Sequence, residues 1–365
     1  MHYNRSDLVD FFMPYTPSET VYKRYFELKH NPGQLEAYRA SLSGELQELL
    51  NSLIYQDQLT SCDMDENYPY FIDTNQNLRV EKHERYSIDT QHHHAFFELI
   101  YVLKGQCRNT IKDRSIWMQE DDICLISPGA VHAMRVFDDS IIINILIRKS
   151  VFKETFFKIP ANDNVLSEYF SEIFYTKNAN HYLIFHTQGD DLLHTVLESL
   201  IWEEYRNRFD KYSDEIKEGL LSAIFSYLIR NHSREMEASK ALYSENPRIM
   251  EVLQYLRENY RTATLKSTAA YFYYTQQHLS RLVRTETGLR FMEILTDIRM
   301  QKACDLLKNT TLRVLEVSSA VGYENTEHFY RAFRRKTGLT PREYRKQNGR
   351  PAVVGAVREN PGEGC

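Results

Sequence analysis

The sequence predicts a multidomain α+β fold, in which an N-terminal β-barrel carries flanking helices and is followed by an all-α C-terminal domain. Short runs of β-branched and aromatic residues, separated by turn residues, follow one another from about residue 68 to residue 147. Apolar residues recur at helical spacing before and after this region, and one helix-turn-helix pattern occurs twice near the C-terminus. Because 365 residues exceed one ordinary core, we expect more than one domain.

The composition is that of a globular protein, with 42% hydrophobic and 26% charged residues, and it excludes a disordered chain. The N-terminal stretch MHYNRSDLVDFFMPY lacks the apolar core of a signal peptide, and the longest apolar run, Ile141–Ile147, is far too short to span a membrane. The five cysteines form no close pair and no zinc-binding or redox motif. We therefore expect a cytoplasmic protein with reduced thiols and no membrane contact.

Residues 1–65 are expected to form a helical N-terminal extension, because the apolar residues from Leu35 to Ile54 keep a helical stripe. We assign this extension no function beyond packing against the barrel or against a partner subunit. Residues 66–150 are expected to form the barrel. Its strands are predicted at Tyr70–Ile72, Phe97–Leu103, Cys107–Ile111, Ser115–Met118, Ile123–Ile126 and Ile141–Ile147.

From residue 151 to residue 231 the pattern indicates helices again. Two amphipathic segments lie between Leu192 and Asn231 and are joined at Asp210–Asp214. Their apolar faces suit either packing on the barrel or pairing with a second subunit. Residues 232–245 are polar and are the predicted linker, residues 246–346 are the helical C-terminal domain, and residues 347–365 are expected to be a disordered tail.

The most informative stretch of the chain runs from Arg313 to Lys346. Apolar residues at helical spacing predict a short helix that ends at Gly322, where glycine permits the positive φ of a tight turn. Asn325 or Thr326 can cap the next helix by accepting hydrogen bonds from its free N–H groups. One face of that second helix is apolar, with Phe329, Ala332 and Phe333, and the other is polar, with His328, Arg331, Arg334 and Arg335. This pattern is typical of a helix-turn-helix, whose second helix enters the major groove of DNA.

A second copy of the pattern lies between Thr264 and Gly288, in LKSTAAYFYYTQQHLSRLVRTETG. Thr275 is a suitable cap for its second helix. The residues that remain on the outer face of that helix are Gln276, Gln277, Ser280, Arg281 and Arg284. Both copies end in Thr-Gly-Leu. Between the copies, Phe291–Asn309 keeps mostly helical spacing and predicts one rigid helix that holds the two motifs at a fixed separation.

The charge of the chain is divided unevenly. Its net charge is −5, but residues 246–346 contain 18 Lys and Arg against 10 Asp and Glu, a balance of +8. The rest of the chain therefore has a balance of −13. A basic C-terminal domain attached to an acidic body is what we expect of a DNA-binding protein with a separate regulatory domain.

Residues 246–346 resemble the DNA-binding domain of the AraC/XylS family of bacterial transcription regulators. The positions that match the family pattern are Val317, Ala320, Val321-Gly322-Tyr323, Phe329, Arg331, Phe333, Gly338, Thr340-Pro341 and Tyr344-Arg345. The resemblance implies a sequence-specific transcription regulator whose N-terminal domain senses a small molecule. It also implies a homodimer formed by the helices between Leu192 and Asn231, and an operator in double-stranded DNA, with RNA polymerase as a further expected contact.

The two recognition helices begin fifty residues apart and should enter successive major-groove segments about 34 Å apart on one DNA face. Arg281 and Arg331 are placed to bind guanine O6 and N7. Gln277, Ser280, Glu327 and His328 match the other base-facing positions of the family. We expect Arg284, Arg334, Arg335 and Lys336 to hold phosphates. The full set of expected DNA-contacting residues is Gln276, Gln277, Ser280, Arg281, Arg284, Asn325, Thr326, Glu327, His328, Arg331, Arg334, Arg335 and Lys336.

A second constellation lies within the predicted barrel. His92, His94 and Glu98 stand in HxH-x3-E spacing, with Gly105 seven residues after the glutamate, and His132 follows about one hairpin later. These positions resemble the two cupin motifs, in which three histidines and a glutamate bind a metal inside the barrel. Tyr86 and Asp121 stand where the motifs have glycine, and Val136 stands where they have asparagine. Three imidazoles and a carboxylate would suit zinc, manganese or non-haem iron.

Attached to an AraC-type domain, such a barrel normally senses a small molecule. We therefore expect His92, His94, Glu98 and His132 to line an effector pocket, with no metal, no cofactor and no catalytic residue. Two alternatives remain open. The chain could be a metal-dependent cupin enzyme with an appended helical domain, which metal analysis would reveal, or a regulator whose barrel binds another protein or itself and takes no small-molecule effector.

Overall fold

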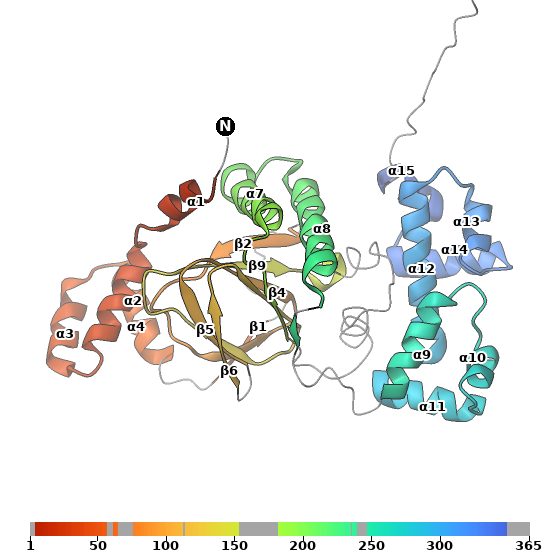
Figure 1. The fold of residues 1–365 in the computed structure, drawn as a ribbon, viewed down its shortest axis with the longest axis horizontal. Coiled ribbons are helices and arrows are strands. Elements are labelled where there is room, and N and C mark those ends of the chain that lie inside the picture. Colours follow the sequence, from red (N-terminus) through yellow and green to blue (C-terminus); the bar gives the residue numbers. More distant parts are fainter. Residues whose placement is uncertain are drawn as a thin grey trace, which may run out of the picture. The chain divides into compact units, whose positions relative to one another are not determined.

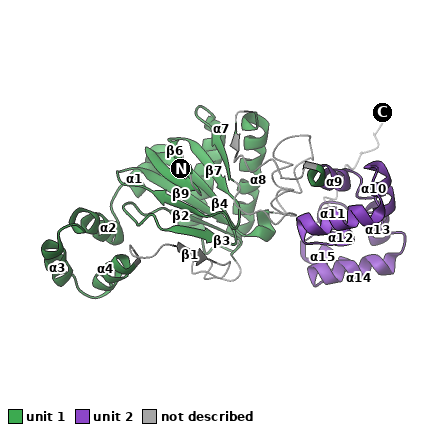
Figure 2. Ribbon diagram, turned by 90° about the horizontal axis from the view of Figure 1, so that it is seen from below, with its two compact units in different colours: residues 1–250 green, residues 251–365 purple. Residues whose placement is uncertain are grey.

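The computed structural model describes residues 4–56, 61–64, 76–111, 114–152, 182–234, 236–238 and 247–348. The chain divides into two compact units, residues 1–250 and 251–365, which Figure 2 shows in green and purple. The division falls inside helix α9 (Pro247–Glu258), and α9 is described here with the helices that follow it. None of the described helices is both long and apolar enough to cross a membrane.

Two β-sheets form the centre of the N-terminal unit (Figure 1). The five-stranded sheet has the order β1-β3-β8-β5-β6, and the six-stranded sheet has the order β11-β10-β7-β4-β9-β2. Apolar side chains from both sheets, among them Ile100, Cys107 and Met134, form one buried cluster between them. The strands are β1 (Ser61–Met64), β2 (Leu78–Lys82), β3 (Gln91–His94), β4 (Phe97–Lys104), β5 (Gln106–Ile111), β6 (Arg114–Gln119), β7 (Asp122–Ile126), β8 (His132–Arg135), β9 (Ile141–Ile147), β10 (Tyr182–His186) and β11 (Glu237–Ala238). This β-rich, cupin-like domain and the helical C-terminal domain confirm the predicted α+β fold class.

Five of the predicted strands are present, as parts of β4, β5, β6, β7 and β9, whereas the strand predicted at Tyr70–Ile72 lies outside the described residues. Three further strands lie outside the region predicted to form the barrel. β1 lies at the end of the expected helical extension and pairs parallel with β3. β10 lies in the region expected to be helical and pairs antiparallel with β7. β11 lies in the expected linker and pairs with β10. β10 and β11 extend the six-stranded sheet, so the barrel draws on residues beyond position 150.

Helices α7 (Asp191–Asn207) and α8 (Ser213–His232) cover the outer face of the six-stranded sheet (Figure 1). Leu197 of α7 and Ile224 of α8 are fully buried in one cluster with strand residues such as Leu99. The apolar faces of the pair are therefore used for packing on the barrel. Ile216 of α8 is an exception among these apolar residues, because its side chain is 45% exposed.

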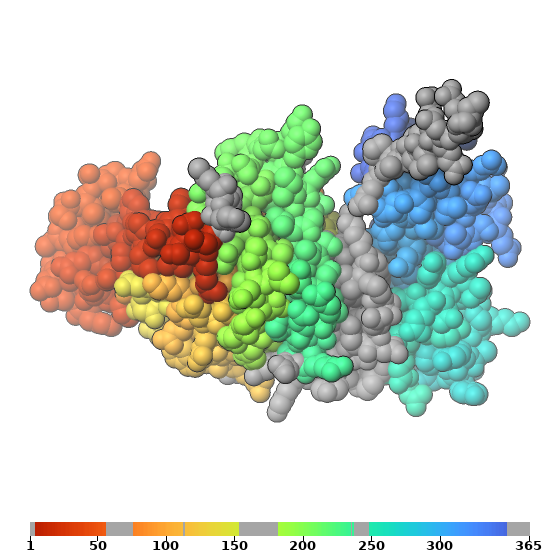
Figure 3. All heavy atoms as spheres, turned by 45° about the horizontal axis from the view of Figure 1, so that its top comes forward, coloured from red at the N-terminus to blue at the C-terminus, as the bar shows by residue number. Residues whose placement is uncertain are grey.

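Four helices precede the sheets: α1 (Arg5–Phe12), α2 (Pro17–Leu28), α3 (Pro32–Ser41) and α4 (Glu45–Gln56). The helical stripe that the sequence shows from Leu35 to Ile54 is interrupted between α3 and α4, at Gly44 (φ 55°). Helix α1 lies against α7 (Figure 3), where the rings of Phe11 and Trp202 contact each other at an angle of 56° with centroids 5.6 Å apart. Helices α2 and α4 share a small apolar cluster of their own.

A buried ion pair joins α2 to the barrel. Glu19 is fully buried, and its carboxylate accepts hydrogen bonds from Arg85 Nε (3.0 Å) and from the Arg85 guanidinium NH2 (2.8 Å). Burial alone would raise the pKa of Glu19, but the hydrogen bonds from Arg85 and Lys82 lower that pKa to about 2. The pair therefore fixes this helix to the barrel as long as Glu19 is ionised.

The two residues that replace the cupin glycines keep a glycine-like backbone. Tyr86 has φ 61° and Asp121 has φ 72°, both in the left-handed region that costs a non-glycine residue free energy. Asp121 gains contacts from its side chain, because its carboxylate accepts a hydrogen bond of 2.5 Å from Arg5 of α1. Both positions thus have a backbone conformation that favours glycine, although neither residue is a glycine.

The C-terminal unit is entirely helical in its described part. Its helices are α9 (Pro247–Glu258), α10 (Leu265–Tyr271), α11 (Gln276–Thr287), α12 (Phe291–Asn309), α13 (Val314–Ala320), α14 (Thr326–Thr337) and α15 (Pro341–Asn348). Helix α12 has the bounds that the sequence predicts, and within this unit it runs between the α9–α11 group and the α13–α15 group (Figure 1). Of the cysteines whose side chains are described, Cys107 and Cys124 are buried and Cys304, on α12, is half-buried, and these three form no disulfide.

Candidate functional site

The first helix-turn-helix consists of α10 and α11. Thr264 caps α10 by accepting a hydrogen bond from Ser267 N (3.0 Å), and Thr275 caps α11 by accepting from His278 N (3.1 Å). The turn between them contains Tyr273, which has φ 57° and a 97% exposed side chain. A tyrosine can occupy this left-handed position because its side chain extends into solvent.

The second helix-turn-helix consists of α13 and α14. Its turn contains Gly322, at φ 84°, in the position that Tyr273 holds in the first copy. Of the two caps that the sequence allowed, Asn325 is the one used, since its side-chain oxygen accepts from Glu327 N (2.8 Å) and His328 N (3.2 Å). The local hydrogen bonds therefore fix where each second helix begins.

The Thr-Gly-Leu sequence that ends both copies performs the same structural task in each. Thr287 Oγ1 donates to the carbonyl of Val283 (2.7 Å) and accepts from Leu289 N (3.0 Å). In the second copy, Thr337 Oγ1 donates to Phe333 O (3.0 Å) and accepts from Leu339 N (3.2 Å). In both copies the intervening glycine, Gly288 or Gly338, is left-handed and ends the helix.

Each second helix has one buried and one outward face. Helix α11 buries Leu279, Val283 and Thr287, and α14 buries Phe329, Ala332 and Phe333. All thirteen residues that the sequence assigns to DNA contact lie outside these buried faces: eleven are exposed, and Ser280 and Thr326 are half-buried. The arrangement presents two outward faces with five arginines and one lysine, which suits a negatively charged partner.

The outward face of α14 is not simply a row of free positive charges. The ammonium group of Lys336 forms an ion pair with Asp297 of α12, so part of its charge is already used within the domain. An open hollow on the outer side of α14 is lined by Thr326, Glu327, Tyr330 and Arg331. Tyr330 is therefore a neighbour of the predicted contact residue Arg331 that the sequence did not single out.

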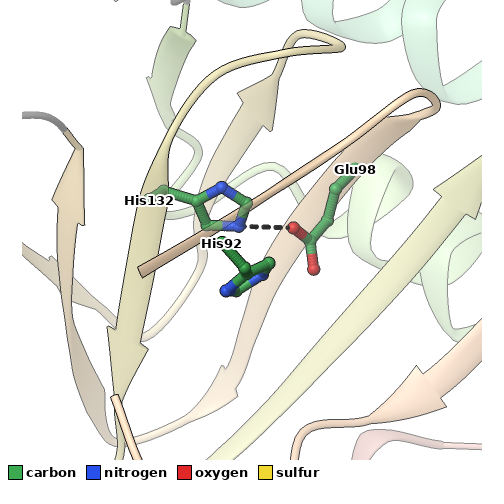
Figure 4. Close-up of side chains that lie close together, drawn as sticks. All are labelled: His92, Glu98 and His132. Carbon is green, nitrogen blue, oxygen red and sulfur yellow. Dashed lines mark hydrogen bonds and ion pairs between the residues drawn. The ribbon is translucent and has the colours of Figure 1, made fainter. Parts of the chain in front are cut away.

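The barrel brings its histidine cluster together across both sheets. β3 carries His92 and His94, and β8 carries His132, which pairs directly with His92 in the five-stranded sheet. Glu98 comes from β4 in the other sheet. Figure 4 shows the side chains of His92, Glu98 and His132 close together. Glu98, His94 and His132 are buried, with exposed fractions of 4%, 2% and 1%.

One carboxylate oxygen is the centre of this cluster. Glu98 Oε2 lies 3.1 Å from His94 Nε2 and 2.9 Å from His132 Nε2. Burial would raise the pKa of Glu98, but the hydrogen bonds with His132 and His94 hold it well below its usual range. For His92, burial and the neighbouring His132 lower the pKa to about 4, so this imidazole is neutral at physiological pH.

The other ring nitrogen of each histidine is bound to the backbone. Nδ1 of His92 lies 3.1 Å from Thr90 O, Nδ1 of His94 lies 2.7 Å from Phe96 O, and Nδ1 of His132 lies 3.1 Å from Ala130 O. A carbonyl only accepts, so each Nδ1 carries a proton, and a ring without a second proton would turn an Nε2 lone pair toward the cluster. Hydrogen bonds from His94 and His132 to Glu98 would then need a second proton on those rings.

The same geometry fits a divalent transition metal. The candidate ligand atoms of His92, Glu98 and His132 all lie within 4.8 Å of one another. Ligand atoms about 2.1 Å from a common metal are about 3.0–3.4 Å apart, close to the 2.9 and 3.1 Å between Glu98 Oε2 and the two Nε2 atoms. Histidines that bind a metal through Nε2 usually donate Nδ1–H to a carbonyl, as these do.

Comparison with known proteins identifies both parts of the chain. Residues 78–141 match the AraC-like ligand binding domain, and residues 268–347 match a helix-turn-helix domain. These two matches are those of an AraC-type transcription regulator. It is 24% identical over 265 residues to the HTH-type transcriptional regulator YfiF of Bacillus subtilis (strain 168), over 70% of this chain and 78% of the relative.

A second relative is the HTH-type transcriptional activator RhaR of Yersinia pestis bv. Antiqua (strain Angola), which is 24% identical over 75% of this chain and 91% of its own. Among solved structures, the C-terminal domain of AraT, a response regulator from Geobacillus stearothermophilus, is 30% identical. That match covers 32% of this chain and 97% of the other, with a TM-score of 0.29. The two domain matches and the two sequence relatives make the protein an AraC-type DNA-binding transcription regulator with an N-terminal ligand-binding domain, and AraC-type regulators are not usually enzymes.

Besides Tyr330, two residues near the sites of this AraC-type regulator were not predicted from the sequence. His278 is exposed on α11 at the position that His328 holds on α14, and the fifty-residue offset between the copies could have revealed it. His83 follows β2, and its charge would interact with those of Glu98 and His132. Burial lowers the pKa of His83 to about 4. No spacing in the sequence connects His83 with the HxH motif.

Proposed function

We propose that this regulator reads operator DNA by placing α11 and α14 in successive major-groove segments. Arg281 and Arg331 bind guanine in this proposal, Gln277, Ser280, Glu327 and His328 face the other bases, and Arg284, Arg334 and Arg335 hold phosphates. Asn325 and Thr326 at the start of α14, and Gln276 at the start of α11, contact the DNA backbone or the adjoining bases. The observation that supports this assignment is the repeat itself: Arg281 and Arg331 are both exposed at the sixth residue of their helices.

We further propose that the barrel binds a small organic effector at His92, His94, Glu98 and His132, without a metal and without catalysis. The cluster lies within the ligand-binding domain, and a ligand could accept hydrogen bonds from its buried imidazoles in place of the contacts that His94 and His132 make with Glu98. Effector and operator affinities must then be coupled, typically by about 1–3 kcal/mol.

Calorimetric titration of an effector, with and without operator duplex, tests this coupling. Reciprocity requires that the operator change effector affinity by the factor by which the effector changes operator affinity, about 5- to 150-fold. Equal effector affinity with and without the duplex would refute coupling through DNA binding. In that case the regulated step would be the contact with RNA polymerase.

The second candidate for the barrel is a divalent metal ion held by His92, His94, Glu98 and His132. It is favoured by the three Nδ1 contacts to backbone carbonyls, which orient the Nε2 atoms toward Glu98. Metal analysis of protein purified without chelator decides between the candidates. Near-stoichiometric iron, manganese or zinc, lost in Glu98→Gln, would support the metal and would reopen the alternative of a metal-dependent enzyme.

We also propose that the regulator acts as a cytoplasmic homodimer. Because the apolar faces of α7 and α8 already pack on the barrel, pairing would use the exposed apolar side chains at the end of this helix pair. These are Phe209 (89% exposed), Tyr212 (55%) and Ile216 (45%). Sedimentation of Phe209→Glu at micromolar concentration should show a weaker dimer than wild type. An unchanged dimer would place the interface elsewhere.

A further inference from the structure

The two helix-turn-helix motifs meet at a junction built from three segments far apart in the sequence. These are the connection between α9 and α10 (residues 259–264), Arg299 in the middle of α12, and the α13–α14 turn at Gly322 and Tyr323. Apolar packing along α12 holds each motif to this shared helix. Apolar packing alone would allow each motif to slide or rotate slightly relative to α12. The hydrogen bonds at the junction are directional and therefore restrict these movements.

Arg299 ties α12 to the α9–α10 connection. Its Nε donates to Tyr260 O (2.8 Å), and its Nη2 donates to Arg261 O (3.3 Å) and to Ala263 O (3.2 Å). The planar fork of arginine can serve several carbonyls at fixed angles, but a lysine ammonium is a single point donor on a flexible stem. These bonds therefore fix the direction of the connection relative to α12.

Gly322 brings the second motif directly against the same connection. A Cβ at this position would lie 2.1 Å from the carbonyl oxygen of Arg261, a distance that no side chain can occupy. The equivalent residue of the first motif, Tyr273, has the same left-handed backbone but is 97% exposed. The left-handed turn of a helix-turn-helix can therefore contain a tyrosine. Glycine is required at position 322 because the backbone of the second motif meets the backbone of Arg261 there.

Aromatic contacts continue this junction to the second reading helix. The guanidinium of Arg299 lies 5.5 Å from the ring centre of Tyr323, and the Tyr323 ring meets Phe329 of α14 edge to face with centroids 5.7 Å apart. Phe329 is fully buried in the core that holds α14, and Tyr260 packs against this same core. Every step from the α9–α10 connection to α14 is therefore a direct contact.

We propose that Arg299, clamped between Tyr260, Arg261, Ala263 and Tyr323, sets the relative position of α11 and α14 and so determines which half-site spacing the regulator accepts. Arg299 is a positioning residue in this proposal and makes no contact with the bases. The inference rests on the proposed reading of DNA by both helices. Without the clamp each motif still folds and binds its own half-site, but the pair loses its common register.

The test uses the full-length protein and a duplex that wild type selects from random sequence. From this duplex we derive variants with one or two base pairs added or removed between the half-sites, and one with a scrambled half-site. Wild type should prefer the selected spacing by about tenfold or more, since rigidly linked modules bind together only when their geometry matches. Arg299→Ala should bind the scrambled duplex as wild type does, with a spacing preference that falls towards one.

Two further variants make the test independent of folding and of charge. Arg299→Lys keeps the charge and the stem but not the fork, and it should show the same loss of spacing preference if Arg299→Ala does not fold. Lys308→Ala removes one positive charge from the same helix and should keep the wild-type preference. A folded Arg299→Lys protein with the wild-type preference would overturn the proposal. A wild-type protein without any spacing preference would instead refute the two-helix reading itself.

Discussion

Replacing Arg331 by alanine should weaken binding to the selected operator by about 5- to 150-fold and relax the preference at one base position. Arg331 is exposed, while the same helix buries Phe329 and Phe333 on its other side, so the substitution removes the guanidinium without opening the core. A bidentate contact with guanine contributes about 1–3 kcal/mol of discrimination against the wrong base, which is the range stated. Arg281→Ala should have the same effect at a base position in the other half-site.

The matched control is Arg335→Ala, an exposed arginine on the same helix that we assign to phosphate. It should weaken binding to all sequences alike and lower the slope of log affinity against log salt by about 0.9. Fluorescence anisotropy with the selected duplex and its single-base variants, over a series of salt concentrations, measures both effects. If Arg331→Ala keeps full discrimination at every base position, the assignment of α14 as a base-reading helix is wrong.

Three further predictions concern the scaffold and the barrel. Ile298→Pro, which breaks α12 at a cost of about 3 kcal/mol or more, should reduce full-site affinity towards that of a single half-site, and a folded variant with full affinity would contradict this. Glu19→Gln should lower the stability of the barrel unit at neutral pH by about 3–5 kcal/mol, because Arg85 stays buried without its counter-charge. Since the pKa of Glu19 is lowered to about 2, the wild-type advantage is present above about pH 4.5 and is lost as pH falls towards 2, so a pH-independent difference in thermal denaturation would refute it. Chelation followed by dialysis should leave the effector response intact, and a response restored only by added iron, manganese or zinc would establish the metal at Glu98.

The helical domain could be predicted closely because its signals are local. Thr275 and Asn325 each cap the start of a helix by hydrogen bonds to residues at most three positions away. The Thr-Gly-Leu sequences end the same helices, and their threonines likewise bond to residues nearby in the chain. The uninterrupted helical spacing of Phe291–Asn309 likewise predicts α12 to the residue. Such elements depend on neighbours along the chain, and the sequence displays those neighbours directly.

The sheets were harder to predict because strands are defined by partners that lie elsewhere in the chain. β3 has the sequence QHHH, without apolar alternation, and becomes a strand only through pairing with β1 and β8. β10 is a short apolar run, YLIFH, whose pattern fits a strand or a buried helix equally well until β7 pairs with it. The residues in between do not reveal such pairings.

The candidate site shows the same division. The motif spacing predicts that His92, Glu98 and His132 belong to one site. It does not predict the contacts that orient the histidine rings, because these depend on the backbone path at Thr90, Phe96 and Ala130. Side-chain contacts between residues far apart in the sequence could not be predicted. Examples are the pairing of Lys336 with Asp297 and the hydrogen bond from Arg299 to Tyr260, which lies 39 residues earlier.

Selection of bound duplexes from random DNA by the full-length protein tests most directly whether both helices read sequence together. Two short half-sites should be enriched, with centres about 10–10.5 base pairs apart on one face of the duplex. Selection with Arg281→Ala should degrade one half-site and selection with Arg331→Ala the other. Enrichment of a single half-site that both variants select unchanged, or no enrichment above non-specific binding, would contradict reading by α11 and α14.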